Sequence, residues 1–345
     1  GERALDLAIW TTAPWTLPGA EAIAFNPRLR YRAYPQGERL LLVAAARRDA
    51  LVRATGLARD EERALEVVPA LLRGLRCAHP LREGASIPLV PDAQIHTGLG
   101  TGLIHIAPGH QRHDLLIARD HGLPLSCVID GAGRFTAEAG SVSGYPVEGA
   151  DDEIVARLHR LGLLLSPLNT SVPRDRSRCA RCGGVVLRRL CDQWLLSLDH
   201  HNLRARTLEA LGRVRWTPPS GRARLAHGLE GQRVWRLSRD RAWGLPIPAL
   251  RCEGCGLAHL DRDLIEHAAD LVEHHGVDAW SELPDQERVP PGYRCARCDD
   301  ASFEPEPAVV DPRFEAGVSF AAVCEARGAE LPADLYVEGI DQHQD

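Results

Sequence analysis

Three C-x-x-C pairs limit the fold of this 345-residue chain more than any other feature of its sequence. The pairs are Cys179/Cys182, Cys252/Cys255 and Cys295/Cys298. A two-residue spacer lets both thiolates of a pair face one ion, and two such pairs form a tetrahedral zinc site. The second and third pairs, in RCEGCG and RCARCDD, belong together. We therefore expect a Zn²⁺ site built from Cys252, Cys255, Cys295 and Cys298.

The alternative for these cysteines is a disulfide or a thiol-redox pair. The chain has no charged and then apolar leader, and no apolar run approaches the length of a membrane span, so we expect an unexported, cytoplasmic protein with no membrane partner. Reduced thiols then favour metal binding. The pair Cys179 and Cys182 remains half a site. Cys191 lies in an apolar segment, LCDQWLLSL, where we expect it to be packed, so the other half-site is expected outside this sequence.

The charge of the chain restricts how it can meet nucleic acid. The net charge is −6, which gives no overall attraction to RNA, so any RNA contact must come from a local patch. All 41 basic residues are arginine. Hydrophobic residues make up 44% of the chain, enough for a sizeable core. Because the sequence has no methionine, we expect a piece of a longer polypeptide.

Residues 1–165 have the pattern of a mixed α/β domain. The stretch ERLLLVAAARRDALVRATG combines a short apolar strand with a helical pattern that ends at Gly56. HDLLIARDHG predicts a short helix, and DDEIVARLHRLG predicts an amphipathic helix capped by Asp151 or Asp152 and closed by Gly162. Together these elements predict a compact, barrel-like α/β domain. The polar segment 166–178, which contains prolines, is the best linker candidate.

Two patterns in the second half of the chain predict secondary structure. HHNLRARTLEALG predicts a helix. AVVDPRFEAG and ADLYVEGIDQHQD have the pattern of strands that run into loops and deliver polar residues to a site.

Six segments occur in an order that is specific to one enzyme family. They are WTTAPWTLP, GTGLIHIAPGHQRHD, DQWLLSLD, LSRDRAWGLPIP, the CEGCG…CARC pair and LYVEGIDQH. With these segments the chain resembles the isoleucyl-tRNA synthetases, class I aminoacyl-tRNA synthetases of the Ile/Val/Leu subgroup, over nearly its whole length. The valyl and leucyl enzymes typically have an arginine after the threonines of the first segment, so TTAPWT favours the isoleucine enzyme.

The resemblance implies an α/β fold in which an editing domain is inserted into a Rossmann-type class I catalytic core. It assigns residues 1–165 to the editing (CP1-type) domain, 166–248 to the connection and return into the core, 249–300 to a zinc ribbon, and 301–345 to the start of the second Rossmann half. It implies a partial chain of a monomeric isoleucine–tRNA ligase. Such an enzyme uses ATP with Mg²⁺, isoleucine and tRNA-Ile, and also hydrolyses valyl-tRNA. The HIGH-type and KMSKS-type ATP signatures are expected upstream and downstream.

The resemblance also implies an editing pocket near the amino end of the chain. Asp114 matches the family aspartate that binds the α-ammonium group, and Thr11 and Thr12 match a threonine strip at the ester. His105 and Thr16 match the wall around the amino-acid side chain. Taken alone, these residues have simpler explanations: a charge at a helix N-terminus, ordinary strand threonines and a core histidine. Only their joint pattern favours a pocket.

Several positions depart from the family pattern. In the synthetic site, Glu338, Asp341 and Gln342 match contacts to the adenylate. Arg313 stands where the family has a tryptophan in the isoleucine pocket, and a buried arginine there carries a high desolvation cost. The other departures are Ile340 and Gln344 in the adenylate segment, and Ala13 and Ala20 in the editing pocket. We expect weakened or altered editing, and an isoleucine pocket that is either rebuilt or inefficient.

Two other functions fit the same residues. One is a degenerate or trans-acting editing hydrolase, which deacylates tRNA without synthesis. The other is a zinc-ribbon module that binds RNA on an inactive scaffold. A reading frame that continues into a KMSKS-like loop favours the ligase, and release of valine from valyl-tRNA excludes the inactive scaffold.

Overall fold

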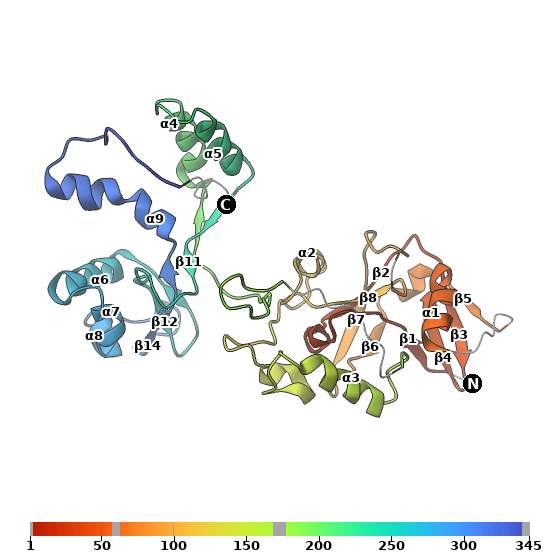
Figure 1. Cartoon of the computed structure of the whole chain (residues 1–345). Helices are drawn as coiled ribbons and strands as arrows, with labels where there is room; N and C mark the ends of the chain where they lie inside the picture. The colour runs from red at the N-terminus through yellow and green to blue at the C-terminus, as the bar shows by residue number, and fades with distance from the viewer. Residues whose placement is uncertain (1–2, 57–62, 99, 168–176, 340–345) are drawn as a thin grey trace. The chain divides into compact units, whose positions relative to one another are not determined.

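The computed structural model describes residues 3–56, 63–98, 100–167 and 177–339. The chain divides into two compact units, Gly1–Cys191 and Asp192–Asp345, both built from helices and strands (Figure 1). This confirms the predicted α/β class. Among the described residues, no helix is both long enough and apolar enough to cross a membrane.

Two four-stranded sheets form the frame of the first unit (Figure 1). The first has the order β1–β4–β3–β5 and contains β1 (Leu5–Leu7), β3 (Tyr31–Gln36), β4 (Arg39–Ala44) and β5 (Leu65–Val67). The second has the order β6–β7–β2–β8 and contains β2 (Ala22–Phe25), β6 (Arg76–Ala78), β7 (Ser86–Pro91) and β8 (Leu103–Ile106). Each sheet has one parallel pair, β1 with β4 and β2 with β7, and is otherwise antiparallel.

Strand β2 serves two hydrophobic cores, because all four of its residues are buried. Successive side chains of a strand point to opposite faces of the sheet. Ile23 and Phe25 join the core shared with the first sheet. Ala22 and Ala24 join a second core, which contains Ile117 of helix α2 (Arg112–Asp120). The strand is therefore a central element of the unit, and it follows directly on the WTTAPWTLP segment.

The helices of the first unit largely follow the sequence patterns. Helix α1 (Arg48–Thr55) ends at Gly56, which has a left-handed φ of 68°, as predicted. Helix α3 (Ala150–Arg160) is also present, but its predicted cap is wrong. The helix begins after Gly149, and the Asp151 carboxylate accepts a hydrogen bond from the Trp15 N–H at 2.9 Å instead. Asp151 thus anchors a distant segment rather than its own helix.

Among its described residues, the second unit contains a helical hairpin, two pairs of strands and one three-stranded sheet (Figure 1). The hairpin pairs α4 (Leu203–Leu211) with α5 (Ser220–Glu230), next to β9 (Leu195–Ser197) and β10 (Val234–Arg236). Strand β11 (Ser238–Arg239) pairs with β15 (Val309–Val310), which leads into α9 (Pro312–Gly317). The predicted helix in HHNLRARTLEALG is confirmed. In AVVDPRFEAG the strand is confirmed, but the predicted loop after it is wrong, because Pro312–Gly317 form helix α9, which Asp311 caps by accepting from the Arg313 N–H. The prediction for ADLYVEGIDQHQD is wrong over 333–339, where the chain forms no strand, and its last residues lie outside the described part.

A three-stranded sheet and three helices surround the cysteine quartet. The sheet has the order β13–β12–β14, with β12 (Leu250–Cys252), β13 (Ala258–His259) and β14 (Phe303–Pro305). The helices are α6 (Arg262–His275), α7 (Ala279–Glu282) and α8 (Asp285–Arg288). Asp261 caps α6 by accepting from the Leu264 N–H at 3.1 Å. Cys252 and Cys295 are buried in the core that joins these elements.

Candidate functional site

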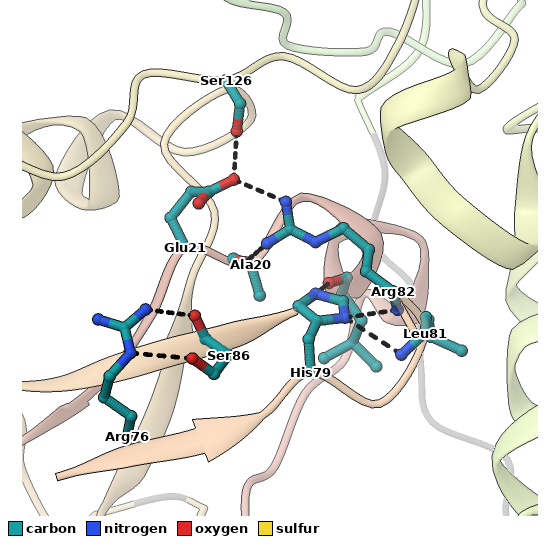
Figure 2. Close-up of polar contacts among 9 residues, drawn as sticks. Ala20, Glu21, Arg76, His79, Leu81, Arg82, Ser86 and Ser126 are labelled. Atoms are coloured by element: carbon teal, nitrogen blue, oxygen red, sulfur yellow. Dashed lines mark hydrogen bonds and ion pairs between the residues drawn. The ribbon is translucent and has the colours of Figure 1, made fainter. Parts of the chain in front are cut away.

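The WTTAPWTLP segment forms a buried turn that is held from two sides. Its 3-10 helix, Pro14–Gly19, starts with proline, whose fixed φ suits a first helical position. The His79 Nδ1 atom accepts from the N–H groups of Leu81 and Arg82, so its Nε2 carries the proton and donates to the Leu17 carbonyl at 3.1 Å (Figure 2). Burial, and secondly the Arg82 charge, lower the pKa of His79 to about 4. A neutral histidine thus fixes the turn.

A buried ion pair holds the end of the same turn (Figure 2). Arg82 donates to the Glu21 carboxylate at 3.0 Å and to the Ala20 carbonyl at 2.5 Å. Ser126 donates to the same carboxylate at 2.6 Å. The two charged side chains are 19% and 9% exposed, so a lost partner leaves a poorly solvated charge. Ala20, a departure from the family pattern, is therefore engaged through its backbone.

Thr16 and His105 are in direct contact. The Thr16 hydroxyl donates to the Ala13 carbonyl at 2.8 Å, so it accepts from His105 Nε2 at 2.7 Å. The other ring nitrogen, Nδ1, is buried with no hydrogen-bond partner among the described residues. Burial, with a smaller effect of His110, lowers the pKa of His105 to about 4. The imidazole is therefore neutral and of fixed tautomer.

Asp114 lies in the first turn of α2 and is only 8% exposed. Its carboxylate accepts from the Ala107 N–H at 2.8 Å, immediately after strand β8. Burial raises the pKa of Asp114 to about 6, although the Ala107 bond and His113 act in the opposite direction. One oxygen of this buried carboxylate is hydrogen-bonded to the backbone, and a cationic partner at the carboxylate would stabilise its ionised form.

The two remaining threonines lie at the entrance of the same segment. Thr11 is half-buried, and its hydroxyl accepts from the Ala13 N–H at 3.0 Å. Thr12 is exposed. Hydrogen bonds therefore link Thr11, through Ala13 and Thr16, to His105. Asp114 is connected to the end of β8, the strand that contains His105, by its hydrogen bond with the Ala107 N–H.

The four cysteines predicted to bind zinc lie together. Their Sγ atoms are within 4.8 Å of one another, with Cys252 to Cys298 and Cys255 to Cys295 both at 3.5 Å. Tetrahedral Zn²⁺ with bonds of about 2.3 Å requires sulfur–sulfur distances of about 3.8 Å. The arrangement of the four side chains therefore fits one such ion.

All three C-x-x-C pairs have the same backbone conformation. In each, the N–H of the first cysteine donates to the carbonyl five residues later, and its own carbonyl accepts from the N–H four residues later. The preceding arginine donates to the carbonyl of that fourth residue. That residue has a positive φ: 70° at Gly183, 71° at Gly256 and 61° at Asp299. The first pair is thus shaped like the two that meet in the quartet.

The pair Cys179 and Cys182 stays a predicted half-site, because its expected partner ligands lie outside this sequence. Cys182 is exposed, and Cys179 is only partly buried. Among the described residues, the quartet is the one set of three or more possible ligands, and neither Cys179 nor Cys182 belongs to it. Two thiolates cannot enclose a tetrahedral ion without further donors. The pair is therefore an incomplete site, in contrast to the four cysteines of the second unit.

The structure describes only some of the residues predicted for the synthetic site. Asp341, Gln342, Ile340 and Gln344 lie outside the described residues. Glu338 and Arg313 line a cavity of about 390 Å³ together with Phe320 and Tyr336. Arg313 donates to the Asp311 carboxylate at 3.0 Å, and Arg239 donates to it too. These arginines, with the Trp235 indole, hold the pKa of Asp311 well below its usual range despite burial.

The sequence profile of the family described as "tRNA synthetases class I (I, L, M and V)" matches residues 38–345. The chain belongs to this family.

This class I synthetase chain is 36% identical to "Isoleucine--tRNA ligase" of Thermotoga maritima over 341 residues, which is 98% of this chain and 37% of the relative. The protein of that name from Geobacter sulfurreducens is 36% identical over 100% of the chain and 37% of the relative. The one from Petrotoga mobilis is 34% identical with the same coverage. The chain therefore spans about 37% of the length of these relatives.

One solved structure is also similar to this class I synthetase chain. "The crystal structure of GlLeuRS-CP1" aligns with 50% of the chain and 87% of its own, at 16% identity and a TM-score of 0.38. A TM-score this low supports no conclusion about the fold of this chain.

The sequence patterns missed the residues that support the turn in this class I synthetase chain. His79 and Arg82 lie 61 or 62 residues along the chain from the residues that they bind at the turn, and one of these is Glu21. Asp151 acts across 136 residues. One signal in the sequence could have indicated these residues: they are charged residues and histidines within apolar stretches. Such groups are rarely buried without a hydrogen-bond or ion-pair partner.

Proposed function

We propose that this chain is the editing portion and part of the catalytic portion of an isoleucine–tRNA ligase. The observation that carries the proposal is 36% identity to a protein of that name over 98% of the chain. The whole enzyme joins isoleucine to tRNA-Ile with ATP and Mg²⁺. Residues 1–165 form a barrel-like editing domain, 166–248 lead back to the core, 249–300 are a zinc ribbon, and 301–345 begin the second Rossmann half, where Glu338, Asp341 and Gln342 contact the adenylate.

Editing is needed because valine lacks only one methylene of isoleucine. A hydrophobic pocket gains about 1–3 kcal/mol from such a group, a limit for which isoleucyl-tRNA synthetase is itself the standard example. A second, smaller site then hydrolyses valyl-tRNA. In this proposal the neutral pair Thr16 and His105 forms the rigid wall of that site.

Asp114 binds the α-ammonium group of the mischarged valine. Its carboxylate is nearly buried, and one oxygen is already engaged by the Ala107 N–H. The other oxygen is available to pair with the ammonium, which also favours the ionised carboxylate. Thr11 and Thr12 lie at the ester, where water attacks the carbonyl carbon and the ester C–O bond breaks. The tRNA leaves through a hydroxyl group of its 3′-terminal ribose, which takes up a proton from the water. Polar groups placed at the developing oxyanion lower the barrier.

The quartet holds a structural Zn²⁺. Four thiolates leave no open coordination position, so the ion stabilises the fold and supplies no chemistry to the reaction. Cys179 and Cys182 are half of a second site of the same kind, because they have the backbone conformation of the two pairs that meet in the quartet. Since Cys182 is exposed, the two further ligands of that site can reach it from a part of the polypeptide outside this sequence.

Substitution of Asp114 tests the editing site. Asp114→Ala in the purified chain should slow the release of valine from valyl-tRNA-Ile by about 10- to 150-fold, the value of a charged hydrogen bond of about 1.5–3 kcal/mol. The matched control is Asp120→Ala, which removes an exposed carboxylate from the same helix and should leave the rate unchanged. Equal rates for both variants would show that Asp114 only supports the structure.

A further inference from the structure

The segment from His200 to Arg236 has a charge opposite to that of the chain. It contains eight arginines and two glutamates, whereas the whole chain has a net charge of −6. The segment therefore carries +6 and the remainder −12. A solvated surface normally mixes both signs in similar numbers, so a large excess of positive charge in an acidic chain indicates an anionic partner.

This segment is one compact body. It consists of the α4–α5 hairpin and strand β10, which pairs with β9 (Figure 1). Arg204 joins its parts by donating to the Gln232 carbonyl at 3.1 Å and to the Asp199 carboxylate. Arg233 donates to the same carboxylate at 3.1 Å. The Trp216 indole donates to the Leu211 carbonyl at 3.0 Å and fixes the turn between the helices. The arginines are therefore displayed on a defined scaffold.

Most of these arginines have no acidic partner. Among the described residues, Arg204, Arg213 and Arg233 form ion pairs with carboxylates. The other five form none, and four of those five are exposed: Arg206, Arg215, Arg222 and Arg236. Their charges are thus free to attract a partner.

One of the exposed arginines reaches across the hairpin. Arg222 starts on α5, but its guanidinium reaches back to the end of α4, 3.7 Å from where a Cβ on Gly212 would lie. Arg213 and Arg215 follow one and three residues after Gly212 in the sequence. Neither helix has an acidic residue in its first turn. Charges within the screening distance of about 8 Å reinforce one another.

We propose that this arginine surface, made of Arg206 on α4, Arg215 between the two helices, Arg222 on α5 and Arg236 on β10, docks the phosphodiester backbone of RNA. A planar guanidinium binds phosphate through two parallel hydrogen bonds, and the basic residues here are all arginine. RNA rather than an anionic membrane is favoured because the chain belongs to a tRNA synthetase family. The proposal rests on tRNA as the substrate of the proposed function. It adds where on this chain the tRNA backbone is held, at a place apart from the residues that act on the ester.

Charge-matched variants of the chain test the surface. The triple variant Arg206→Gln, Arg215→Gln, Arg222→Gln is compared with Arg53→Gln, Arg73→Gln, Arg119→Gln, which removes the same charge from exposed positions in the first unit. The affinity for uncharged tRNA-Ile is measured at salt concentrations from about 50 to 200 mM. Over this range, an affinity that depends on phosphate contacts falls steeply. The surface variant should bind about tenfold or more weakly, and its salt slope should fall by about 2–3, since each phosphate contact contributes about 0.9. Phosphate contacts carry no sequence information, so a tRNA of different sequence should show the same loss.

Other outcomes overturn the proposal. Equal losses in both triple variants would mean that total charge alone matters, and unchanged binding in the surface variant would remove the site. Binding of phosphatidylserine vesicles without binding of tRNA would assign the surface to a membrane. Because uncharged tRNA is not hydrolysed, these results are independent of the Asp114 test. A chain that still releases valine while its surface variant binds tRNA normally would keep the proposed function and lose only this inference.

Discussion

At the scale of single residues, buried histidines and one buried carboxyl group set how the stability of the first unit responds to acid. His79 and His105 have a pKa of about 4 in the folded chain, against about 6.5 when unfolded. Between these values only the unfolded state binds the proton, so stability falls as the pH drops from 6.5 to 4. Asp114, with its pKa raised to about 6, acts oppositely, because the folded state binds its proton first between pH 6 and 3.8. Burial also lowers the pKa of His110, so three histidines oppose one carboxyl group.

We expect the free energy of unfolding of the first unit to fall below pH 6.5. Each buried histidine contributes about 1.4 kcal/mol per pH unit, and Asp114 offsets one of them below pH 6. The free energy of unfolding is measured in urea at pH 7, 6 and 5, with the amide hydrogen exchange of β8 as the signal for the first unit. His105→Gln should reduce the slope, whereas His96→Gln, at an exposed position, should not. A flat profile between pH 7 and 5 would mean that these histidines are protonated in the folded chain.

At the scale of elements, the cysteine quartet is part of the core it sits in. Cys252 and Cys295 are buried with Leu264 and Phe303, and few other side chains fill this small module. Removing the metal should therefore unfold the module rather than loosen it. We expect Cys295→Ser, or chelation, to remove about one equivalent of zinc and to abolish exchange protection in β12, β14 and α6, while β2 and β8 stay protected. The control is Cys324→Ser, outside the quartet. Full protection in metal-free protein would show that the module folds without an ion.

Elements that depend on nearby residues could be predicted from the sequence, and elements that depend on distant ones could not. The three C-x-x-C turns and the end of α1 at Gly56 follow from a few adjacent residues. The cap of α3 was wrong because Asp151 is recruited by Trp15 from across the unit. The buried pair Glu21–Arg82 is invisible to local patterns for the same reason. In the candidate editing site the residue types were predictable, but the supports that fix them were not.

At the scale of the whole molecule, each hydrophobic core draws its residues from one unit. The cores around Trp15, Phe25 and Ile106 lie within Gly1–Cys191, and those around Leu250 and Ile247 lie within Asp192–Asp345. Burial of apolar surface is the main favourable term in folding. Each unit therefore contains what it needs to fold by itself.

The end of the first unit can be located by truncation. The family resemblance predicts an editing domain that ends at residue 165, but residues 187–190 contact the candidate site. Arg188 accepts from His110 at 3.1 Å, the Leu190 N–H donates to Gly109 at 2.8 Å, and Leu187 packs against the core that contains Trp15. Two hydrogen bonds and one partly buried leucine are together worth about 2–4 kcal/mol. A chain of residues 1–191 should therefore unfold at a higher urea concentration than one of residues 1–165, and should hydrolyse valyl-tRNA faster because His110 packs edge-on against Trp15 in the turn. Equal midpoints and equal rates would place the boundary at residue 165.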